Sequence, residues 1–260
     1  MKPVVLFRGS RDYPDEFAAA QRHLKVIESR LEVQPDDLVI PRYSALPFYR
    51  ELEADVAALG ARLINTHRQH LFVSEFRGWY ERLEGLTPRS WFRLQDVPKD
   101  GGPYVLKGCT NSKKFSWRTH MYAETFADAV RVHSRLLEDG LVGQQDIVIR
   151  EYVPLVTYDT DPQGCPISQE YRFFVIGGKV ACGGYYWSNY PECPDRDPSV
   201  VPSEFLNSAI SKISDEVPFF VIDVAKTAAG DWTVIEINDG QMSGLSECDP
   251  DMLYRLLSLI

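Results

Sequence analysis

Hydrophobic and polar residues alternate through two neighbouring segments of the chain, residues 219–226 and 231–238. A period of two is typical of half-buried β-strands. Between the segments, residues 228–231 supply the small and polar positions that end a strand. The pattern therefore predicts a β-hairpin over residues 219–238.

Three oxygen-bearing side chains share one face of this hairpin. A turn between Ala229 and Gly230 makes position 223 the direct cross-strand partner of position 236. Asp223, Glu236 and Asn238 then lie together, because strand side chains alternate between two faces. Opposed carboxylates lie about 5 Å apart at Cβ and repel each other, which favours a cation between them. Three oxygen ligands with room for water and phosphate suit Mg²⁺. The alternative is an outward-facing polar row on an edge hairpin.

The first 70 residues alternate between strand and helix patterns. Strands are expected at residues 4–7, 38–40 and 61–65, and helices at residues 16–31 and 48–59. Such alternation indicates a small open parallel sheet. A helix rich in aromatic residues is expected at residues 75–83, and Thr87–Pro88 marks a boundary.

The rest of the chain mixes strands and helices, with antiparallel pairs late in the sequence. Strands are expected at residues 91–94, 104–107, 146–153, 170–176 and 179–187, and helices at residues 125–138, 203–216 and 250–259. Gly177 and Gly178, between the last two of these strands, are a strong hairpin signal. We therefore expect an α/β N-terminal domain, residues 1–87, followed by two α+β units, residues 88–153 and 154–260.

Lys107 ends an apolar strand and precedes a loop, residues 108–117, that contains Lys113 and Lys114. A lysine at such a position can hold phosphate oxygens as a point charge, while loop amides add hydrogen bonds. The loop is not a Walker loop, because GxxxxGK[ST] is absent. The alternative is an ordinary lysine whose charged end reaches solvent beside a polar loop.

Two further strands carry charged residues within apolar sequence. Residues 147–154 are apolar except at Arg150 and Glu151. A strand that runs into a proline can act as a hinge and present its backbone to an adenine edge, or it can be a core strand with a surface ion pair. Glu170 and Arg172 share a face of the next strand, where an arginine can hold phosphate bidentately. The alternative for this pair is a surface row.

Composition limits the classes of function. The chain has 260 residues, 44% of them hydrophobic, and a formal net charge of −9, which argues against a dominant nucleic-acid surface but allows a local basic cleft. Its five cysteines form no CxxC pair, so a reducing cytoplasm is expected. The early apolar run at residues 4–7 is too short for a signal segment or a membrane span. His67 and His70 lack neighbouring zinc ligands, and no nucleophile motif such as GxSxG is present.

The order of these features resembles the ATP-grasp superfamily, in which two α+β lobes clamp ATP and a smaller α/β domain precedes them. The features are a strand lysine, a loop of small residues, a hinge strand with a glutamate, and then Asp and Glu-x-Asn in a late hairpin. The resemblance covers residues 88–260 best. The compact layout and the strand EYRFFV are similar to the small phage and bacterial branch called the R-two-K clade.

The resemblance implies a role for each candidate residue. The residues that would contact phosphate are Lys107, Lys113, Lys114 and Arg172, and of these Lys107 and Arg172 would also be catalytic. The residues that would contact adenine and ribose are Glu151, Tyr152 and Val153. The ligands of Mg²⁺ would be Asp223, Glu236 and Asn238. Residues 239–244 would border the acceptor.

The resemblance also implies an activity. The protein would be a ligase that uses ATP and Mg²⁺ to activate a carboxylate for attack by an amine or similar nucleophile, with a metabolite, peptide or protein as acceptor. Two alternatives stay open. One is a kinase, and the other is an ATP-binding assembly factor with little turnover, similar to the eukaryotic ATP-grasp proteins that assist translation-initiation-factor assembly.

Overall fold

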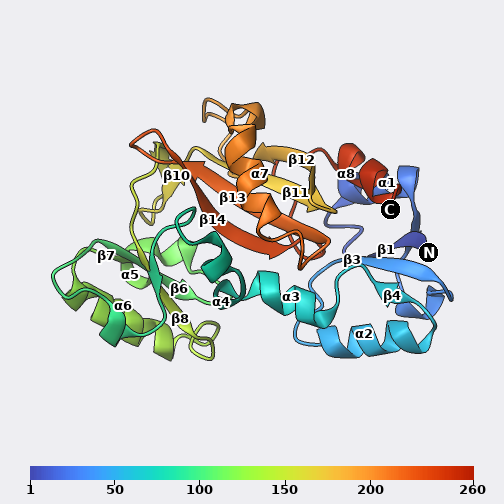
Figure 1. The fold of residues 1–260 in the computed structure, drawn as a ribbon, viewed down its shortest axis with the longest axis horizontal. Coiled ribbons are helices and arrows are strands. Elements are labelled where there is room, and N and C mark those ends of the chain that lie inside the picture. The colour runs from blue at the N-terminus through green and yellow to red at the C-terminus, as the bar shows by residue number, and fades with distance from the viewer.

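A computed structural model describes residues 1–260 and divides the strands among three four-stranded sheets and one two-stranded sheet (Figure 1). The first sheet lies beside the N-terminus and is parallel, with the order β2-β1-β3-β4. It comprises β1 (Lys2–Phe7), β2 (Lys25–Ile27), β3 (Asp37–Arg42) and β4 (Arg62–Leu63), with α1 (Pro14–His23) and α2 (Tyr49–Ala58). The predicted parallel α/β unit is confirmed.

The predicted helix over residues 16–31 is wrong in its second half. α1 ends at His23, and the chain continues as β2, which pairs in parallel with β1. Val26 and Ile27 are β-branched, and Ile27 becomes buried at this sheet edge. Pairing with a neighbouring strand therefore overrides the helical spacing of the apolar residues.

The second sheet is antiparallel, with the order β5-β8-β6-β7, and forms the lobe at the opposite end of the molecule (Figure 1). It comprises β5 (Ser90–Trp91), β6 (Tyr104–Gly108), β7 (Tyr122–Ala123) and β8 (Ile147–Glu151), with α5 (Trp117–His120) and α6 (Phe126–Glu138). α6 begins where the sequence predicts. The Thr125 hydroxyl accepts from the Asp128 N–H, and the Asp128 carboxylate accepts from the Thr125 N–H.

The third sheet lies between the other two and is antiparallel, with the order β12-β11-β13-β14. It comprises β11 (Glu170–Ile176), β12 (Lys179–Tyr185), β13 (Phe219–Lys226) and β14 (Trp232–Asp239), and a short ribbon of β9 (Thr157–Thr160) and β10 (Pro166–Ser168) precedes it. Its helices are α7 (Ser203–Ser211) and α8 (Pro250–Leu257). Gly177 and Gly178 both have positive φ, 53° and 76°, as the predicted tight turn between β11 and β12 requires.

The late hairpin has the predicted register at its functional end. Asp223 pairs directly with Glu236 as predicted, but the turn is centred on Ala229 and not between Ala229 and Gly230, because Lys226 pairs with Trp232. A bulge follows on the side toward the turn, so that Val224 pairs with Val234. The bulge leaves the two carboxylates opposite each other and shifts only the tip of the hairpin.

Two helices that connect the first and second sheets complete the fold. α3 (His67–Ser74) was not among the predicted elements, and α4 (Phe76–Tyr80) lies within the predicted aromatic helix. α3 begins with a capping box in which Thr66 and Gln69 exchange hydrogen bonds. Together the helices bury Val73, Phe76 and Trp79 against the central sheet.

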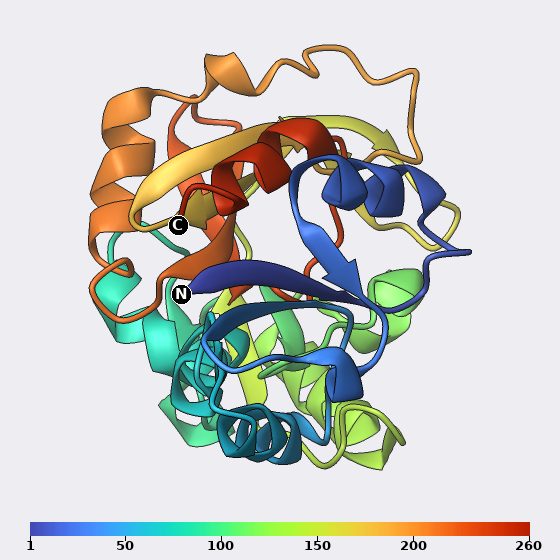
Figure 2. The same cartoon turned by 90° about the vertical axis from the view of Figure 1, so that its right-hand side faces the viewer.

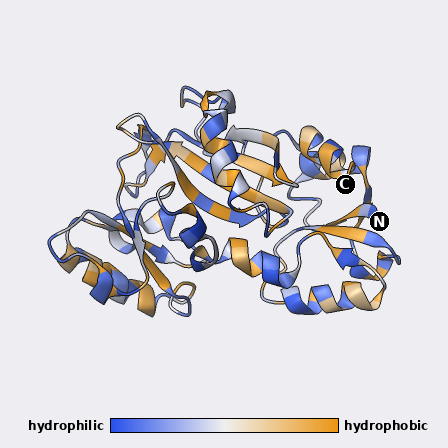
Figure 3. Cartoon of the chain, viewed as in Figure 1, coloured by the Kyte–Doolittle hydropathy of each residue, from blue (hydrophilic) through white to orange (hydrophobic).

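The N-terminal sheet and the central sheet share one hydrophobic core. Phe7 and Ile40 of the N-terminal sheet pack with Phe174, Phe219 and Leu257. Figure 2 shows α8 beside α1, although the two helices are far apart in sequence, and Figure 3 shows the hydrophobic residues concentrated on the sheets. All five cysteines are buried and unbridged. None of the helices combines the length and apolar character needed to span a bilayer.

A buried arginine connects the N-terminal sheet to the segment that follows β14. Arg42, at the end of β3, pairs with Glu16 of α1 at 2.6 Å, and both side chains are more than nine-tenths buried. Its two terminal nitrogens donate to backbone carbonyls, Nη1 to Gly240 and Nη2 to Ser243 at 2.9 Å. Tyr254 of α8 donates to the same Glu16 at 2.7 Å. One guanidinium therefore joins α1, α8 and the 240–243 loop.

We expect Arg42→Met to lower the free energy of unfolding by about 3–5 kcal/mol, because Glu16 would remain buried without its partner. Urea unfolding followed by circular dichroism measures this loss. The matched control is Arg22→Met, since Arg22 also joins α1 to α8, through Asp251, but in a pair whose side chains are 53% and 47% exposed. That variant should lose no more than about 1 kcal/mol. Equal losses in the two variants would contradict the role assigned to Arg42.

Candidate active site

One face of the central sheet changes from apolar to charged along its strands. On β11, Phe174 belongs to the core shared with the N-terminal sheet, and Arg172, two residues earlier, lies on the same face. On β13, Val221 and Asp223 repeat this change. Glu170 and Glu236 extend the charged half, so the surface-row alternatives for both strands are wrong: Glu170, Arg172 and Asp223 are all buried.

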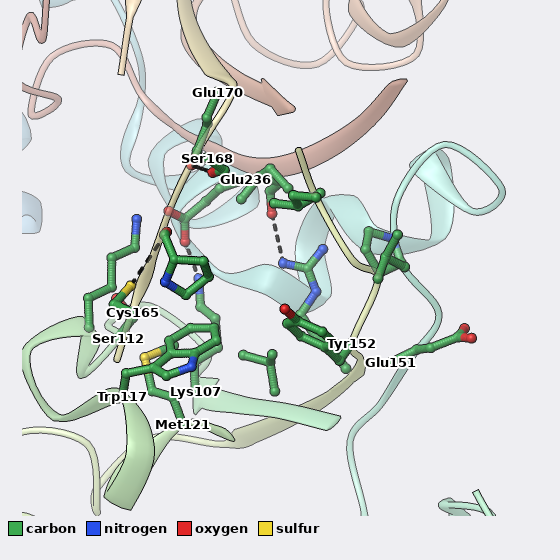
Figure 4. Close-up of a pocket in the computed structure, with 18 of the residues that line it drawn as sticks. Lys107, Ser112, Trp117, Met121, Glu151, Tyr152, Cys165, Ser168, Glu170 and Glu236 are labelled. Atoms are coloured by element: carbon green, nitrogen blue, oxygen red, sulfur yellow. Dashed lines mark hydrogen bonds and ion pairs between the residues drawn. The ribbon is translucent and has the colours of Figure 1, made fainter. Parts of the chain in front are cut away.

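A cavity lies where this charged half faces the lobe of the second sheet (Figure 4). Six of the predicted site residues line it: Lys107, Lys114, Glu151, Tyr152, Val153 and Glu236. Its other polar lining residues include Ser112, Arg150, Ser168 and Glu170, and its apolar walls include Val105, Trp117, Met121, Leu155 and Ile235. An apolar pocket with a charged end is suited to a ligand that has a flat base and an anionic tail.

Lys107 and Glu236 form an ion pair between the two lobes. Lys107 comes from β6, Glu236 comes from β14, and the Lys107 ammonium donates to Glu236 Oε1. Burial acts to raise the pKa of Glu236, but the charges of Lys107 and Lys114 outweigh it and lower that pKa to about 2. Glu236 is therefore an anion at neutral pH, and Lys107 is not a solvent-reaching lysine, since it is only 6% exposed.

Lys114 reaches across the cavity to the central sheet. Its ammonium lies 4.3 Å from the centre of the Tyr186 ring and 4.8 Å from that of Trp187, and it donates to the Tyr186 hydroxyl at 2.9 Å. Lys113 takes the other direction and pairs with Asp139 at 2.8 Å. The structure therefore brings Lys107 and Lys114 together and leaves Lys113 outside the cavity.

Arg172 and Asp223 form a second buried pair, next to the cavity rather than in its lining. The Arg172 guanidinium donates to both oxygens of Asp223, at 2.9 and 2.8 Å. A third nitrogen donates to the carbonyl of Gly244 at 2.8 Å, and the guanidinium lies 4.9 Å from the centre of the Tyr186 ring. Tyr186 thus contacts both Lys114 and Arg172.

The three predicted Mg²⁺ ligands are close together but differ in their present contacts. Both oxygens of Asp223 accept from Arg172, whereas Glu236 lies in the cavity and Asn238 lies two residues further along β14. No group of three or more His, Cys, Asp or Glu side chains is arranged to hold a metal ion anywhere in the chain. Carboxylate and amide oxygens beside a phosphate-sized opening fit Mg²⁺, which keeps several waters and needs few protein ligands.

The hinge segment presents one free backbone position to the cavity. The N–H groups of Glu151 and Tyr152 donate to Arg89 and Pro103, but no hydrogen bond involves the N–H or C=O of Val153. The Glu151 side chain is exposed and points away from the cavity (Figure 4). Of the three predicted hinge residues, Val153 therefore has the backbone groups available for an adenine edge.

Arg150 is not part of a surface ion pair with Glu151. It is 7% exposed and donates to the Ile235 carbonyl at 2.8 Å and to Thr87 at 2.9 Å. Burial lowers its pKa to about 10. Arg150 therefore connects the hinge strand to β14, the strand that carries Glu236.

Glu170 is the residue that sequence reasoning undervalued. It is 3% exposed, and one oxygen accepts from Trp187 at 3.1 Å and Ser168 at 3.2 Å. The other oxygen, Oε1, has no partner. The strand alone does not show this burial, but a buried carboxylate oxygen without a hydrogen-bond partner is costly, which marks Glu170 as a candidate ligand contact. For Trp117 and Met121, nothing local predicts a place in the cavity wall.

A family model for the ATP-grasp domain, R2K clade family 3, matches residues 95–257. The chain belongs to this family. The matched range contains every predicted site residue, the central sheet, and all strands of the second sheet except β5. No match was found among curated proteins.

Solved structures share the fold over nearly the whole chain. D-cycloserine synthetase DcsG has a TM-score of 0.62 at 12% identity, covering 99% of this chain and 97% of that one. D-alanine–D-alanine ligase from Bacillus anthracis has a TM-score of 0.60 at 12% identity, covering 99% and 94%. The ATP-grasp ligase PsnB, complexed with a minimal precursor, Mg and ADP, has a TM-score of 0.59 at 11% identity, covering 98% and 96%. The predicted ATP-grasp fold and R-two-K clade are confirmed.

We expect Glu170→Gln to stabilise the ligand-free protein at neutral pH. Burial raises the pKa of Glu170 from 4.5 to about 6, although Lys114 opposes this rise. The protonated form of Glu170 therefore contributes fully to the free energy of unfolding below pH 4.5, and this contribution is lost as the pH rises through 6. The variant should exceed the wild type by up to roughly 2 kcal/mol at pH 7.5 and match it at pH 4.5.

Urea unfolding of both proteins at the two pH values measures this difference. Glu84→Gln, at an exposed position, is the control and should show no pH-dependent difference from the wild type. A Glu170→Gln variant that is less stable than the wild type at pH 7.5 would contradict the burial of an under-bonded carboxylate.

Proposed function

We propose that this protein is an ATP- and Mg²⁺-dependent ligase that activates a carboxylate as an acyl phosphate and joins it to an amine or a similar nucleophile. A carboxylate oxygen attacks the γ-phosphorus of ATP, and ADP leaves. The nucleophile then attacks the acyl carbon, phosphate leaves, and the nucleophile loses a proton. No side-chain nucleophile is required, which agrees with the absence of such a motif.

The observation that carries this proposal is the inter-lobe cavity, in which Lys107 and Lys114 converge on Glu236. The two ammonium groups are suited to phosphate oxygens. At the hinge, the free N–H and C=O of Val153 are suited to the edge of a base. Between these ends, the unpartnered oxygen of Glu170 needs a donor, and the ribose hydroxyls of a nucleotide would supply one.

Charge stabilisation is the main task we assign to the other residues. Lys107 would exchange Glu236 for the phosphates, and Arg172 would hold the γ-phosphate with Nη1, the nitrogen that now donates to the Gly244 carbonyl. Glu236 and Asn238 would hold Mg²⁺, with Asp223 positioned beside them by Arg172. When bound, the ion neutralises charge on the transferring phosphoryl group. Charged groups fixed in place before the reaction usually contribute more to catalysis than any other single effect.

The structural neighbours support a ligase over the two alternatives. PsnB is a ligase described with Mg and ADP, and another neighbour is a D-alanine–D-alanine ligase. Mass spectrometry of reactions with ATP, Mg²⁺ and a panel of acids and amines separates the three possibilities. A ligase forms a condensed product and ADP, a kinase adds one phosphate, and an assembly factor forms neither.

Nucleotide binding should be selective for adenine and strengthened by Mg²⁺. We expect ATP with Mg²⁺ to raise the melting temperature clearly, because a ligand that binds only the folded state at one hundred times its Kd stabilises it by about 2.7 kcal/mol. ATP without Mg²⁺ should raise it less, and GTP with Mg²⁺ should raise it little, since guanine reverses the hydrogen-bonding edge presented to Val153. Differential scanning fluorimetry measures all three. Equal shifts with ATP and GTP would contradict adenine recognition by Val153. No shift with any nucleotide would overturn the proposed function.

Glu236→Gln should fold but lose Mg²⁺-dependent ADP formation by at least a hundredfold. The amide keeps the size of the side chain but removes the anionic ligand, and each tenfold loss of rate corresponds to about 1.4 kcal/mol. Coupled ADP assays across Mg²⁺ concentrations measure the effect. Glu138→Gln, on the exposed face of α6, is the control. Wild-type turnover in purified Glu236→Gln would remove the metal assignment.

A further inference from the structure

The N-terminal sheet has a topological switch point at the carboxyl ends of β1 and β3. The two strands are neighbours, with Phe7 opposite Arg42 at their ends, while β2 lies on the far side of β1 and β4 on the far side of β3. In open α/β sheets, ligands bind in the crevice outside the carboxyl ends of strands at such a point.

One cation without a carboxylate partner lies at this point, and a second follows three residues later in the loop between β1 and α1. Arg8 directly follows β1, and its guanidinium lies 4.6 Å from the centre of the Tyr43 ring, which directly follows β3. Arg8 and Arg11 are exposed and form no ion pair, whereas nearby Arg30 is paired with Asp55. The nearby carboxylate of Glu28 accepts from Ser10 at 3.2 Å.

The switch point adjoins the loop that follows the predicted metal ligands. Arg42, one residue before Tyr43, donates to the carbonyls of Gly240 and Ser243. Tyr43 and Met242 pack against the same apolar cluster of the N-terminal sheet. A molecule whose carboxylate lies near Asn238 could therefore extend over this loop toward Arg8.

We propose that Arg8 and Arg11 bind a second anionic group of the acceptor, remote from the carboxylate that is activated. The inference rests on the proposed function, because it places the reacting carboxylate beside Glu236 and Asn238. The chain has a net charge of −9, so two cations without ion-pair partners in the loop at this edge of the sheet would favour an anionic ligand. Arg8, held over the Tyr43 ring, is suited to bidentate contact with a carboxylate or phosphate. The acceptor class is thus a dianionic acid rather than a simple monocarboxylate.

Isothermal titration calorimetry with the full chain, Mg²⁺ and a non-hydrolysable ATP analogue tests this assignment. The probes are glutarate and 3-phosphonopropionate, which carry a second anionic group, each compared with butyrate as the monoanionic counterpart. We expect at least one dianionic probe to bind at least tenfold more tightly than butyrate. We expect Arg8→Gln to reduce that preference at least tenfold, and Arg8→Lys to retain part of it.

Arg62→Gln is the matched control, because Arg62 is also exposed and lacks a carboxylate partner but lies at the amino end of β4. It should leave the preference unchanged. The inference is overturned if no dianionic probe binds more tightly than butyrate, or if Arg8→Gln keeps the preference. Binding of the ATP analogue, measured in the same samples, distinguishes failure of this inference from failure of the proposed function. Retained nucleotide binding without dianion preference removes this inference alone, whereas loss of nucleotide binding in the wild type removes the proposed function as well.

Discussion

The burial of the Arg42 guanidinium is the constraint on which the arrangement of the site depends. A buried cation must be paired and hydrogen-bonded, and here its partners come from three distant parts of the chain: Glu16 in α1, the Gly240 and Ser243 carbonyls, and, through Glu16, Tyr254 in α8. Satisfying this one group sets the position of the loop that directly follows Asn238. The N-terminal sheet is therefore a structural support of the site as well as its neighbour.

In and beside the cavity, charges of opposite sign are paired in the ligand-free protein. Lys107 faces Glu236, Arg172 faces Asp223, and Lys114 lies close enough to Glu170 to affect its pKa. Such pairing allows six ionisable groups to be largely removed from water in one region, where unpaired charges would be strongly destabilising. A nucleotide phosphate with its cation would add charges of both signs, so these groups could exchange partners without any of them being left unpaired.

The local sequence pattern predicted the parts of the site that depend on strand alternation. It failed for side chains whose direction or burial depends on contacts with residues far away in the sequence. Asp223 and Glu236 were placed opposite each other because a period of two leaves few registers for a short hairpin. Lys113 and Lys114 were indistinguishable in sequence, because their directions depend on Asp139 and on the Tyr186–Trp187 pair. Glu170 looked like a surface residue, since nothing in its own strand shows that the second lobe covers it.

The core shared by the N-terminal and central sheets has a consequence for the order in which the chain can fold during synthesis. Phe7 and Ile40 pack against Phe174, Phe219 and Leu257, which leave the ribosome much later. The N-terminal sheet therefore keeps one apolar face uncovered until most of the chain has been made. Exposed apolar surface of this kind is prone to aggregation, so the nascent chain depends on rapid completion of synthesis or on protection by a chaperone.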